Sequence, residues 1–341
     1  MNCPSPSPPR LRRWLSYALG GLLCSATIGF LLLKLTTPSF EWRQLAVLPA
    51  KGVLSLVLMV VTAWICNGLR TWRLSHIVGH PIRLVKAVGI TLSMEFAIAA
   101  TPAGFGGMVT RVALQKKQGI PYAASTAMMT ADWVADLLFF AILTPVGIWQ
   151  LAGLAAQWDL NWRVPGLLAL ALLACVLIGC CAWSVREKMR SWIPARYRYI
   201  WRARWSRLAE TVSEHLQSVK QCARMVGSSH RMDYLWVLLF ASVQWTCRYG
   251  ILVVIFVLLG QSIPPVLLML LQGSLFLLGL VVVLPGGGGS VEVLSTVALS
   301  PLVGVQSATL AVVIWRFFTY YLYLMGGGGA FLLNARTLFA K

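Results

Sequence analysis

The hydrophobic residues of this chain fall into long runs that are separated by short polar stretches. A helix rises about 1.5 Å per residue, so roughly 20 apolar residues cross a hydrocarbon core about 30 Å thick. Eight apolar segments have about this length or are somewhat shorter, and they cover residues 14–34, 50–69, 87–101, 121–150, 163–184, 234–259, 265–284 and 304–333. The pattern predicts an all-α integral membrane protein.

Composition supports this prediction, because the 341 residues are 58% hydrophobic and only 11% charged, with a mean hydropathy of +0.74. A soluble domain carries about 25% charged residues. The net charge of +19 lies in short segments between the apolar runs rather than on one basic face. That distribution is typical of loops kept in the cytoplasm, and it favours anionic lipid over nucleic acid as the electrostatic partner.

Basic segments also predict the topology. The span 70–86 holds Arg70 and Arg73, and the span 185–233 holds eleven Lys or Arg against four Asp or Glu. Both should be cytoplasmic, as should the disordered, basic N-terminal arm (1–13) and the C-terminal tail (334–341). The longer loop mixes tryptophan and tyrosine with arginine, which indicates amphipathic helices lying on anionic lipid.

A full crossing by 87–101 would put Lys116 and Lys117 on the outer side. We therefore expect 87–118 to be a re-entrant hairpin that returns to the cytoplasmic side. The span 265–303 should form a second hairpin, entered from the outside. One membrane domain (14–333) would then hold about six full transmembrane helices and two hairpins, with both termini in the cytoplasm.

The two hairpins share a motif, since "TPAGFGGMVTR" and "LPGGGGSVEVL" match at one offset. The matched pairs are Pro102 with Pro285, Gly104 with Gly287, and Gly106 with Gly289. Under the predicted topology the halves, about 50–150 and 234–333, are inverted repeats. Helix breaks at matching positions of inverted halves indicate a transporter's substrate site.

The candidate site residues at these breaks are Pro102, Gly104, Gly106, Pro285, Gly286, Gly287, Gly288 and Gly289. Freed backbone groups are tolerated in a membrane only where protein or a wet cavity satisfies them, and such groups can hold a polar headgroup. A further run, Gly326 to Gly329, has no proline beside it. For that run we expect close helix packing instead.

Ionisable residues inside the predicted membrane segments are also candidates, because such residues are expensive in hydrocarbon. They are Glu95, Asp132, Asp136, Arg248, Glu292 and Arg316. Asp132 and Asp136 share one helical face and need a cation, for which Arg316 or Arg248 is the expected partner. A structural ion pair stays open as an alternative to substrate binding, and for Glu95 so does a hydrogen bond to freed backbone.

The sequence "PGGGGSVEVL", followed by "AVVIWRFFTYYL", resembles the C-terminal signature of a flippase-like family, that of the lysylphosphatidylglycerol synthase transmembrane region. "TPAGFGGMVTRVALQKKQGI" resembles the half-motif of its N-terminal half, so the resemblance covers about 14–333. It implies a stand-alone member, without the soluble transferase domain, that handles lipid in a bacterial inner membrane. Arg316 occupies the family's arginine position, which favours it over Arg248 as the phosphate ligand.

These features predict a transporter that moves a lipid or polyprenyl-linked intermediate with an anionic headgroup between leaflets. Two alternatives remain. One is an intramembrane transferase with Glu292 or the Asp132 and Asp136 pair as general base. The other is a non-transporting partner of a lipid-synthesis enzyme. No nucleotide-binding loop or metal-ligand spacing occurs in the sequence, so no catalytic residues, cofactor or metal are expected.

Overall fold

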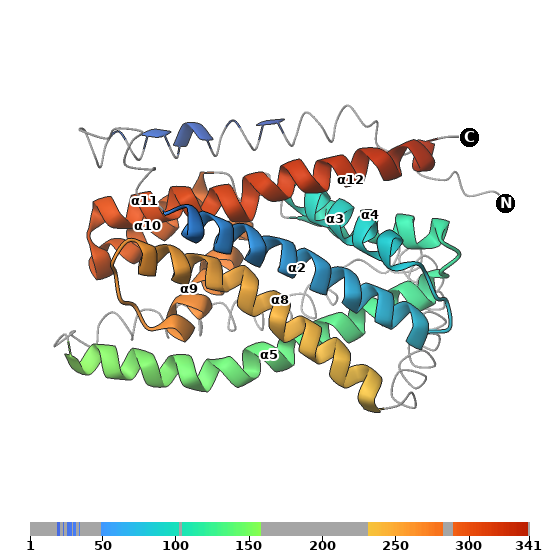
Figure 1. Ribbon diagram of the computed structural model, residues 1–341, viewed down its shortest axis with the longest axis horizontal. Coiled ribbons are helices and arrows are strands. Elements are labelled where there is room, and N and C mark those ends of the chain that lie inside the picture. The colour runs from blue at the N-terminus through green and yellow to red at the C-terminus, as the bar shows by residue number, and fades with distance from the viewer. Residues whose placement is uncertain are drawn as a thin grey trace, which may run out of the picture.

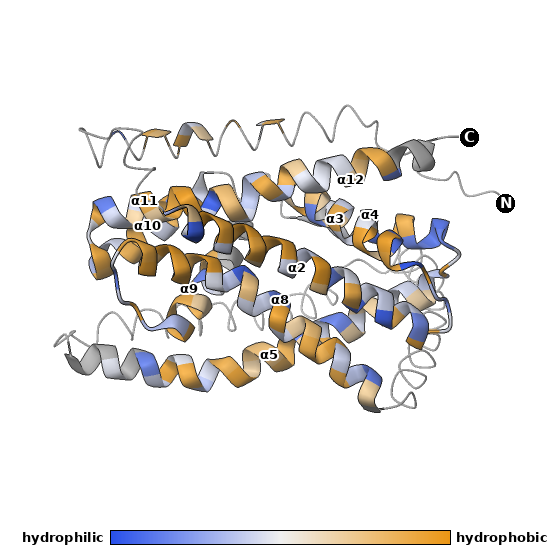
Figure 2. Ribbon diagram, viewed as in Figure 1, coloured by the Kyte–Doolittle hydropathy of each residue, from blue (hydrophilic) through white to orange (hydrophobic). Residues whose placement is uncertain are grey.

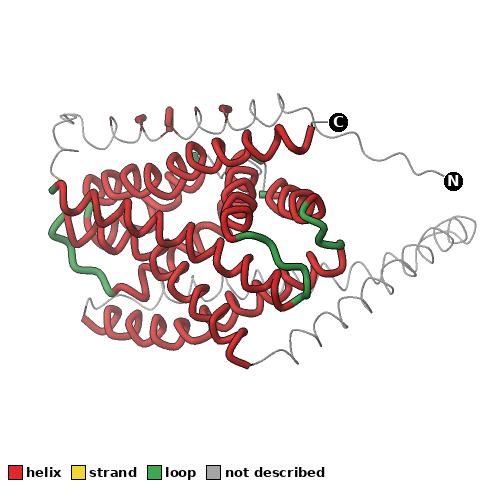
Figure 3. Tube along the Cα trace, turned by 45° about the vertical axis from the view of Figure 1, so that its right-hand side comes forward, coloured by secondary structure: helices red, strands yellow, loops and turns green. Residues whose placement is uncertain are grey.

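The computed structural model describes residues 49–101, 104–157, 231–281 and 289–339, with scattered positions between 19 and 34. The predicted segment 163–184, the N-terminal arm and nearly all of the basic loop lie outside the described residues, as does most of segment 14–34. Within the described ranges the chain forms helices and short connections, and no strand (Figure 3). The all-α prediction is confirmed there.

Four helices are long and apolar enough to cross a membrane. They are α2 (Ala50–Ile77), α5 (Tyr122–Gln157), α8 (Arg231–Leu258), and a continuous helix made of α11 (Val305–Arg316), the π-helical turn η2 (Phe317–Tyr321) and α12 (Leu322–Phe339). The 28 residues of α2 span about 42 Å, which exceeds the hydrocarbon core. Hydrophobic residues cover most of these helices (Figure 2).

Shorter helices lie at the two predicted breaks. α3 (Leu84–Ala100) packs against α4 (Phe105–Lys117), and α9 (Pro265–Val281) packs against α10 (Ser290–Val303). The two pairs lie toward opposite ends of the molecule (Figure 1). This is the arrangement that inverted hairpins require, although the inversion and the re-entrant path themselves stay predictions.

Among the described residues the core consists of three hydrophobic clusters, and the two larger ones lie toward opposite ends of the antiparallel helices α2 and α8. Leu56 and Val60 of α2 pack in one cluster with Ile251 and Ile255 of α8. Toward the other end, Leu74 of α2 belongs to a second cluster that contains Val237 and Ala241 of α8. The segments of α2 and α8 between these clusters carry polar residues, so the two cores leave a polar layer between them.

Glycines let α12 approach its neighbours closely. A Cβ atom on Gly327 would lie 2.6 Å from the carbonyl oxygen of Leu92 in α3, and one on Gly326 would lie 2.6 Å from the ring of Trp64 in α2. Asn334, further along α12, donates to the carbonyl oxygen of Gly89. Gly326 and Gly327 therefore serve helix packing, as predicted for this run, whereas a Cβ on Gly329 would meet nothing within 4 Å.

Two helix ends differ from the prediction. The helix expected to end at residue 69 continues to Ile77, and α12 continues to Phe339, into the predicted tail. Arg70 and Arg73 are therefore part of α2 rather than of a loop. The prediction was wrong because it ended the segment at the first charged residue, although the buried stripe of α2 continues past Arg70 to Leu74.

Candidate functional site

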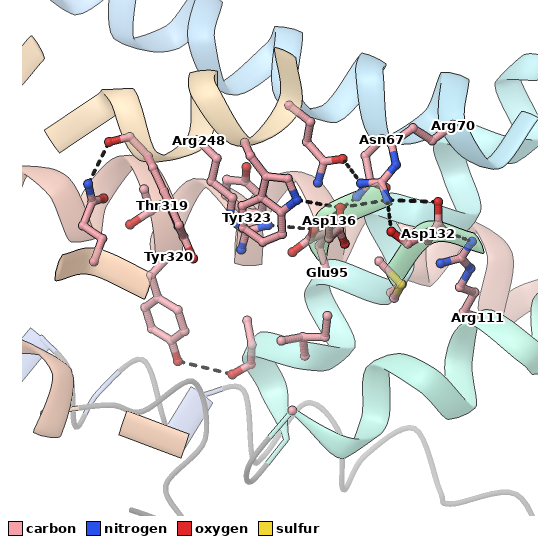
Figure 4. Close-up of a pocket in the computed structure, with 18 of the residues that line it drawn as sticks. Asn67, Arg70, Glu95, Arg111, Asp132, Asp136, Arg248, Thr319, Tyr320 and Tyr323 are labelled. Carbon is pink, nitrogen blue, oxygen red and sulfur yellow. Dashed lines mark hydrogen bonds and ion pairs between the residues drawn. The ribbon is translucent and has the colours of Figure 1, made fainter. Parts of the chain in front are cut away.

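A cavity of about 490 Å³ lies in the polar layer between the two cores. Its wall is built from both halves of the chain, with residues from α2, α3, α4, α5, α8, α9, α11, η2 and α12. Four arginines line it, together with three carboxylates and several aromatic rings (Figure 4). Buried charges at this depth are costly unless they are paired, so their partners define the site.

Arg70 is the centre of the largest cluster of charges. Its Nη2 atom lies 3.1 Å from Oδ1 of Asp132 and 2.9 Å from Oδ1 of Asp136, on successive turns of α5. Its Nη1 atom donates to the side-chain oxygen of Gln244 in α8 at 2.7 Å. Arg111 of α4 forms a second ion pair with Asp132, through the other carboxylate oxygen. This cluster therefore ties α2, α4, α5 and α8 together.

Outside this cluster, a separate ion pair joins the two halves of the chain. Nη1 of Arg248 in α8 lies 2.9 Å from Oε1 of Glu95 in α3, and the same oxygen accepts a hydrogen bond from Asn67 at 3.3 Å. The guanidinium of Arg248 also lies 4.8 Å from the centre of the Tyr323 ring. A cation over an aromatic face is stabilised there, which holds the arginine against α12.

Another separate ion pair lies beside the second helix break. Nε of Arg316 donates to Oε1 of Glu292 at 2.8 Å, and Oε2 of Glu292 accepts a hydrogen bond from the backbone N–H of Gly289 at 2.8 Å. Glu292 thus satisfies a backbone donor at the start of α10 while it holds the arginine of α11. The guanidinium of Arg316 lies 4.6 Å from the centre of the Tyr320 ring.

All six ionisable residues selected from the sequence lie at these clusters, but one predicted pairing is wrong. Asp132 and Asp136 are neutralised by Arg70 and Arg111, not by Arg316 or Arg248. The prediction failed because it assigned Arg70 and Arg111 to cytoplasmic segments and sought partners only among the charges of the apolar runs. It therefore did not consider the two cations that are nearest in space.

Glycine shapes the described part of each break. Gly104 has a φ of 71° and precedes α4, and Gly289 has a φ of 84° and precedes α10. Side chains rarely adopt this left-handed region, which explains glycine at both positions. The sequence match paired Gly104 with Gly287, whereas the structural counterpart of Gly104 is Gly289. Counted along the sequence from the matched proline, this glycine comes two positions later in the second motif than in the first.

Only some residues of the two predicted breaks lie within the described residues. Gly106 is buried at the start of α4, where its N–H donates to the hydroxyl of Thr101 at 2.9 Å. Gly104 lines the cavity. The remaining break residues lie outside the described ranges, namely Pro102, Pro285, Gly286, Gly287 and Gly288.

Several functional groups were missed by sequence reasoning. Besides Arg70 and Arg111, the cavity wall includes Gln244, Gln272 and Trp315. The Oε1 atom of Gln272 and the Nε1 atom of Trp315 are buried and have no hydrogen-bond partner among the described residues. Neutral amides and indoles carry no charge signal in an apolar sequence, so only the fold reveals them. Unpartnered polar atoms in a cavity wall are available to a ligand or to water.

Among the described residues, no group of three or more His, Cys, Asp or Glu side chains comes together as a metal site would require. The four carboxylates of the site each contact an arginine. Such an arrangement suits the binding of a charged group by exchange of ion-pair partners. A general base would first have to leave its arginine.

The fold and the cavity define a polytopic α-helical membrane protein with buried ion pairs around an interior cavity. The family described as the lysylphosphatidylglycerol synthase TM region matches residues 15–327, and the chain belongs to this family. The resemblance drawn from the two glycine motifs is thereby confirmed. A UPF0104 membrane protein of Archaeoglobus fulgidus is similar over 310 residues at 23% identity, which covers 90% of this chain and 94% of that protein.

Proposed function

We propose that this protein moves a lipid or lipid-linked intermediate with an anionic headgroup between the leaflets of a bacterial inner membrane. The observation that carries the proposal is the interior cavity, in which arginines from α2, α4, α8 and α11 meet. Arginine binds phosphate oxygens through two parallel N–H donors, so it suits a phosphate headgroup better than lysine does.

The size of the cavity supports a headgroup as the bound part. Ligand pockets have volumes of roughly 300–1,000 Å³, and about 490 Å³ falls at the lower end of that range. A headgroup fits such a volume, whereas the acyl or prenyl chains do not and would stay in the bilayer. Carrying only the polar part through the protein removes the main cost of leaflet exchange, which is the transfer of a charged group through hydrocarbon.

The proposal includes the predicted topology. The α3–α4 and α9–α10 pairs would be re-entrant hairpins of two inverted repeats, and both termini would be cytoplasmic. Alternating access in such transporters comes from movement of one repeat against the other around a fixed site. The Arg248 to Glu95 ion pair joins the two halves and would separate in that movement.

The proposal is tested with purified full-length protein in liposomes that carry fluorescently labelled lipids of matched chains. We expect protein-dependent leaflet exchange of lipids with an anionic headgroup. Lys117→Gln, which changes an exposed cation at the end of α4, is the matched control and should exchange lipid at the native rate. Absence of protein-dependent exchange for every anionic lipid in the panel contradicts the proposal.

A further inference from the structure

Two residues of the cavity wall also reach the outer surface of the described helices, one from α4 and one from α5. Of the described residues that line the cavity, only Met108 and Trp133 are more than a third exposed, at 51% and 58%. Met108 belongs to α4 and Trp133 to α5, and both helices contact each other. These two side chains are therefore where the cavity wall comes nearest to the surroundings of the bundle, which makes the α4–α5 contact the candidate entrance.

The rim of this candidate entrance is hydrophobic, and a charged pair lies directly behind it. Arg111 follows Met108 by about one helical turn and Asp132 precedes Trp133, and both are buried. Figure 4 shows Arg111 and Asp132 together at one end of the cavity. An apolar rim at membrane depth suits hydrocarbon chains, and the arginine behind it suits the phosphate that those chains carry.

The ion-pair network indicates which arginine can change partner. Asp132 contacts both Arg111 and Arg70, so it keeps a cation when Arg111 leaves. The Nε atom of Arg111 is also buried without a hydrogen-bond partner among the described residues. Its guanidinium is therefore not saturated by the protein groups that surround it.

For Arg248, by contrast, leaving its ion-pair partner would be costly. Its departure would leave the buried carboxylate of Glu95 with one hydrogen bond among the described residues, from the side-chain amide of Asn67 at 3.3 Å. Removing one member of a buried ion pair is strongly destabilising when the other member stays buried. Partner exchange is thus least costly at Arg111.

We infer that a phosphate-bearing lipid enters the cavity sideways, between α4 and α5, and that Arg111 binds its phosphate in exchange for Asp132. This inference rests on the proposed function and names its first step. Arg316, which sequence reasoning favoured as the phosphate ligand, has the partner Glu292 and would act after entry. The hydrocarbon chains stay outside the rim that Met108 and Trp133 form.

The test uses photo-crosslinking from α5 in liposomes. A benzoylphenylalanine is placed at position 133, on the rim, or at position 142, where Ile142 is 67% exposed and does not line the cavity. Each protein is offered dioleoyl phosphatidate or dioleoylglycerol, which share their chains and differ in the phosphate. We expect position 133 to label phosphatidate at least about tenfold more than dioleoylglycerol, the effect of one charge-assisted contact, and position 142 to label both equally.

Variants then assign this preference to Arg111. Arg111→Gln should remove it, while Arg73→Gln, which breaks the ion pair with Asp233 away from the cavity, should retain it. Should Arg111→Gln fail to fold, the double variant Arg111→Gln with Asp132→Asn removes both members of the pair and takes its place. A preference for phosphatidate in folded Arg111→Gln or in the folded double variant overturns the inference. So does equal labelling of the two lipids at position 133 in the native protein.

A measurement of leaflet exchange in the same liposomes distinguishes failure of this inference from failure of the proposed function. A phosphate preference at position 133 without any lipid exchange leaves the entrance in place and contradicts transport. Exchange of anionic lipid without that preference contradicts the entrance and leaves transport in place. Excess inorganic phosphate should not reduce labelling at position 133, because the hydrocarbon chains hold the lipid at the rim.

Discussion

Four arginines and four carboxylates meet around the cavity, and each contacts a group of opposite charge. Buried ion pairs contribute little net stability, because desolvation of both charges offsets their attraction. Replacing such pairs by hydrophobic residues is often neutral or stabilising. Their presence in a chain that is otherwise so apolar is therefore better explained by binding than by folding.

The pair between Arg248 and Glu95 gives a test of this balance. Arg248→Gln should lower the thermal stability of the protein in detergent, with a loss of about 3 kcal/mol in unfolding free energy, because Glu95 is left charged and buried. Adding Glu95→Gln should recover most of this loss. A double variant that is as unstable as the single variant would show that the cost is not that of a stranded charge.

Arg316 gives a test of the bidentate guanidinium. Arg316→Lys keeps the charge beside Glu292 but loses the planar pair of donors, so it should retain part of the transport rate. Arg316→Gln should lose most of that rate. Rates in liposomes, normalised to folded protein, measure the difference, and equal rates for the two variants would argue against a phosphate contact.

At the scale of elements, the second helix of each break begins directly after a glycine with positive φ, Gly104 before α4 and Gly289 before α10. The second half adds a π-helical turn between Arg316 and α12. Such turns insert an extra residue into a helix and are frequent at functional sites. Here the turn carries Thr319 and Tyr320, which line the cavity.

Gly327 lies where α12 approaches the backbone of α3 closely. Gly327→Ala should destabilise the protein by about 1–3 kcal/mol, because its Cβ would lie 2.6 Å from the backbone oxygen of Leu92. Gly329→Ala is the matched control, since nothing lies within 4 Å of a Cβ there. Thermal unfolding in detergent compares them, and equal midpoints would contradict the packing role.

The re-entrant path of the α3–α4 pair is tested by cysteine accessibility in inverted and right-side-out vesicles, on a background without native cysteines. Lys116→Cys at the end of α4 and Ser228→Cys should react from the cytoplasmic side. Gly260→Cys, in the turn after α8, should react from the opposite side. Labelling of position 116 only from the outer side would show that the pair crosses the membrane.

The positions of α2, α5, α8 and the final long helix could be predicted from hydrophobic run length alone. So could the helix breaks, because proline and clustered glycine disfavour a continuous helix. The partners of the charges could not be predicted. A rule that assigns arginines near helix ends to loops does not reveal that Asp132 of α5 contacts Arg70 of α2 and Arg111 of α4.

A signal for Arg70 was present in the sequence. The buried positions Leu56, Val60, Asn67 and Leu74 recur with helical spacing along α2, and Arg70 lies on the same stripe. A charged residue that continues a buried helical face needs an internal partner. If the periodic pattern is followed past the first arginine, the predicted helix becomes longer and Arg70 is placed in the interior of the helix bundle.

At the scale of the whole molecule, two hydrophobic cores are joined by α2 and α8, and the charged cavity lies between them. A third cluster joins α3 to the final long helix through Phe96, Tyr320 and Leu324, so apolar packing as well as ion pairs connects the two halves. The ion pairs of the polar layer connect elements of different ends. They are the contacts that movement between the halves would exchange.

The balance of charges around the cavity determines how the protein responds to voltage. Four guanidinium and four carboxylate groups sum to zero, so an electric field across the membrane does no net work on them when they move together. A bound lipid with one negative charge makes the moving unit electrogenic. At 100 mV its distribution between leaflets should then shift by about 2.3 kcal/mol, or roughly fiftyfold, whereas a zwitterionic lipid should stay evenly distributed. Liposomes polarised by a potassium gradient and valinomycin would measure this difference.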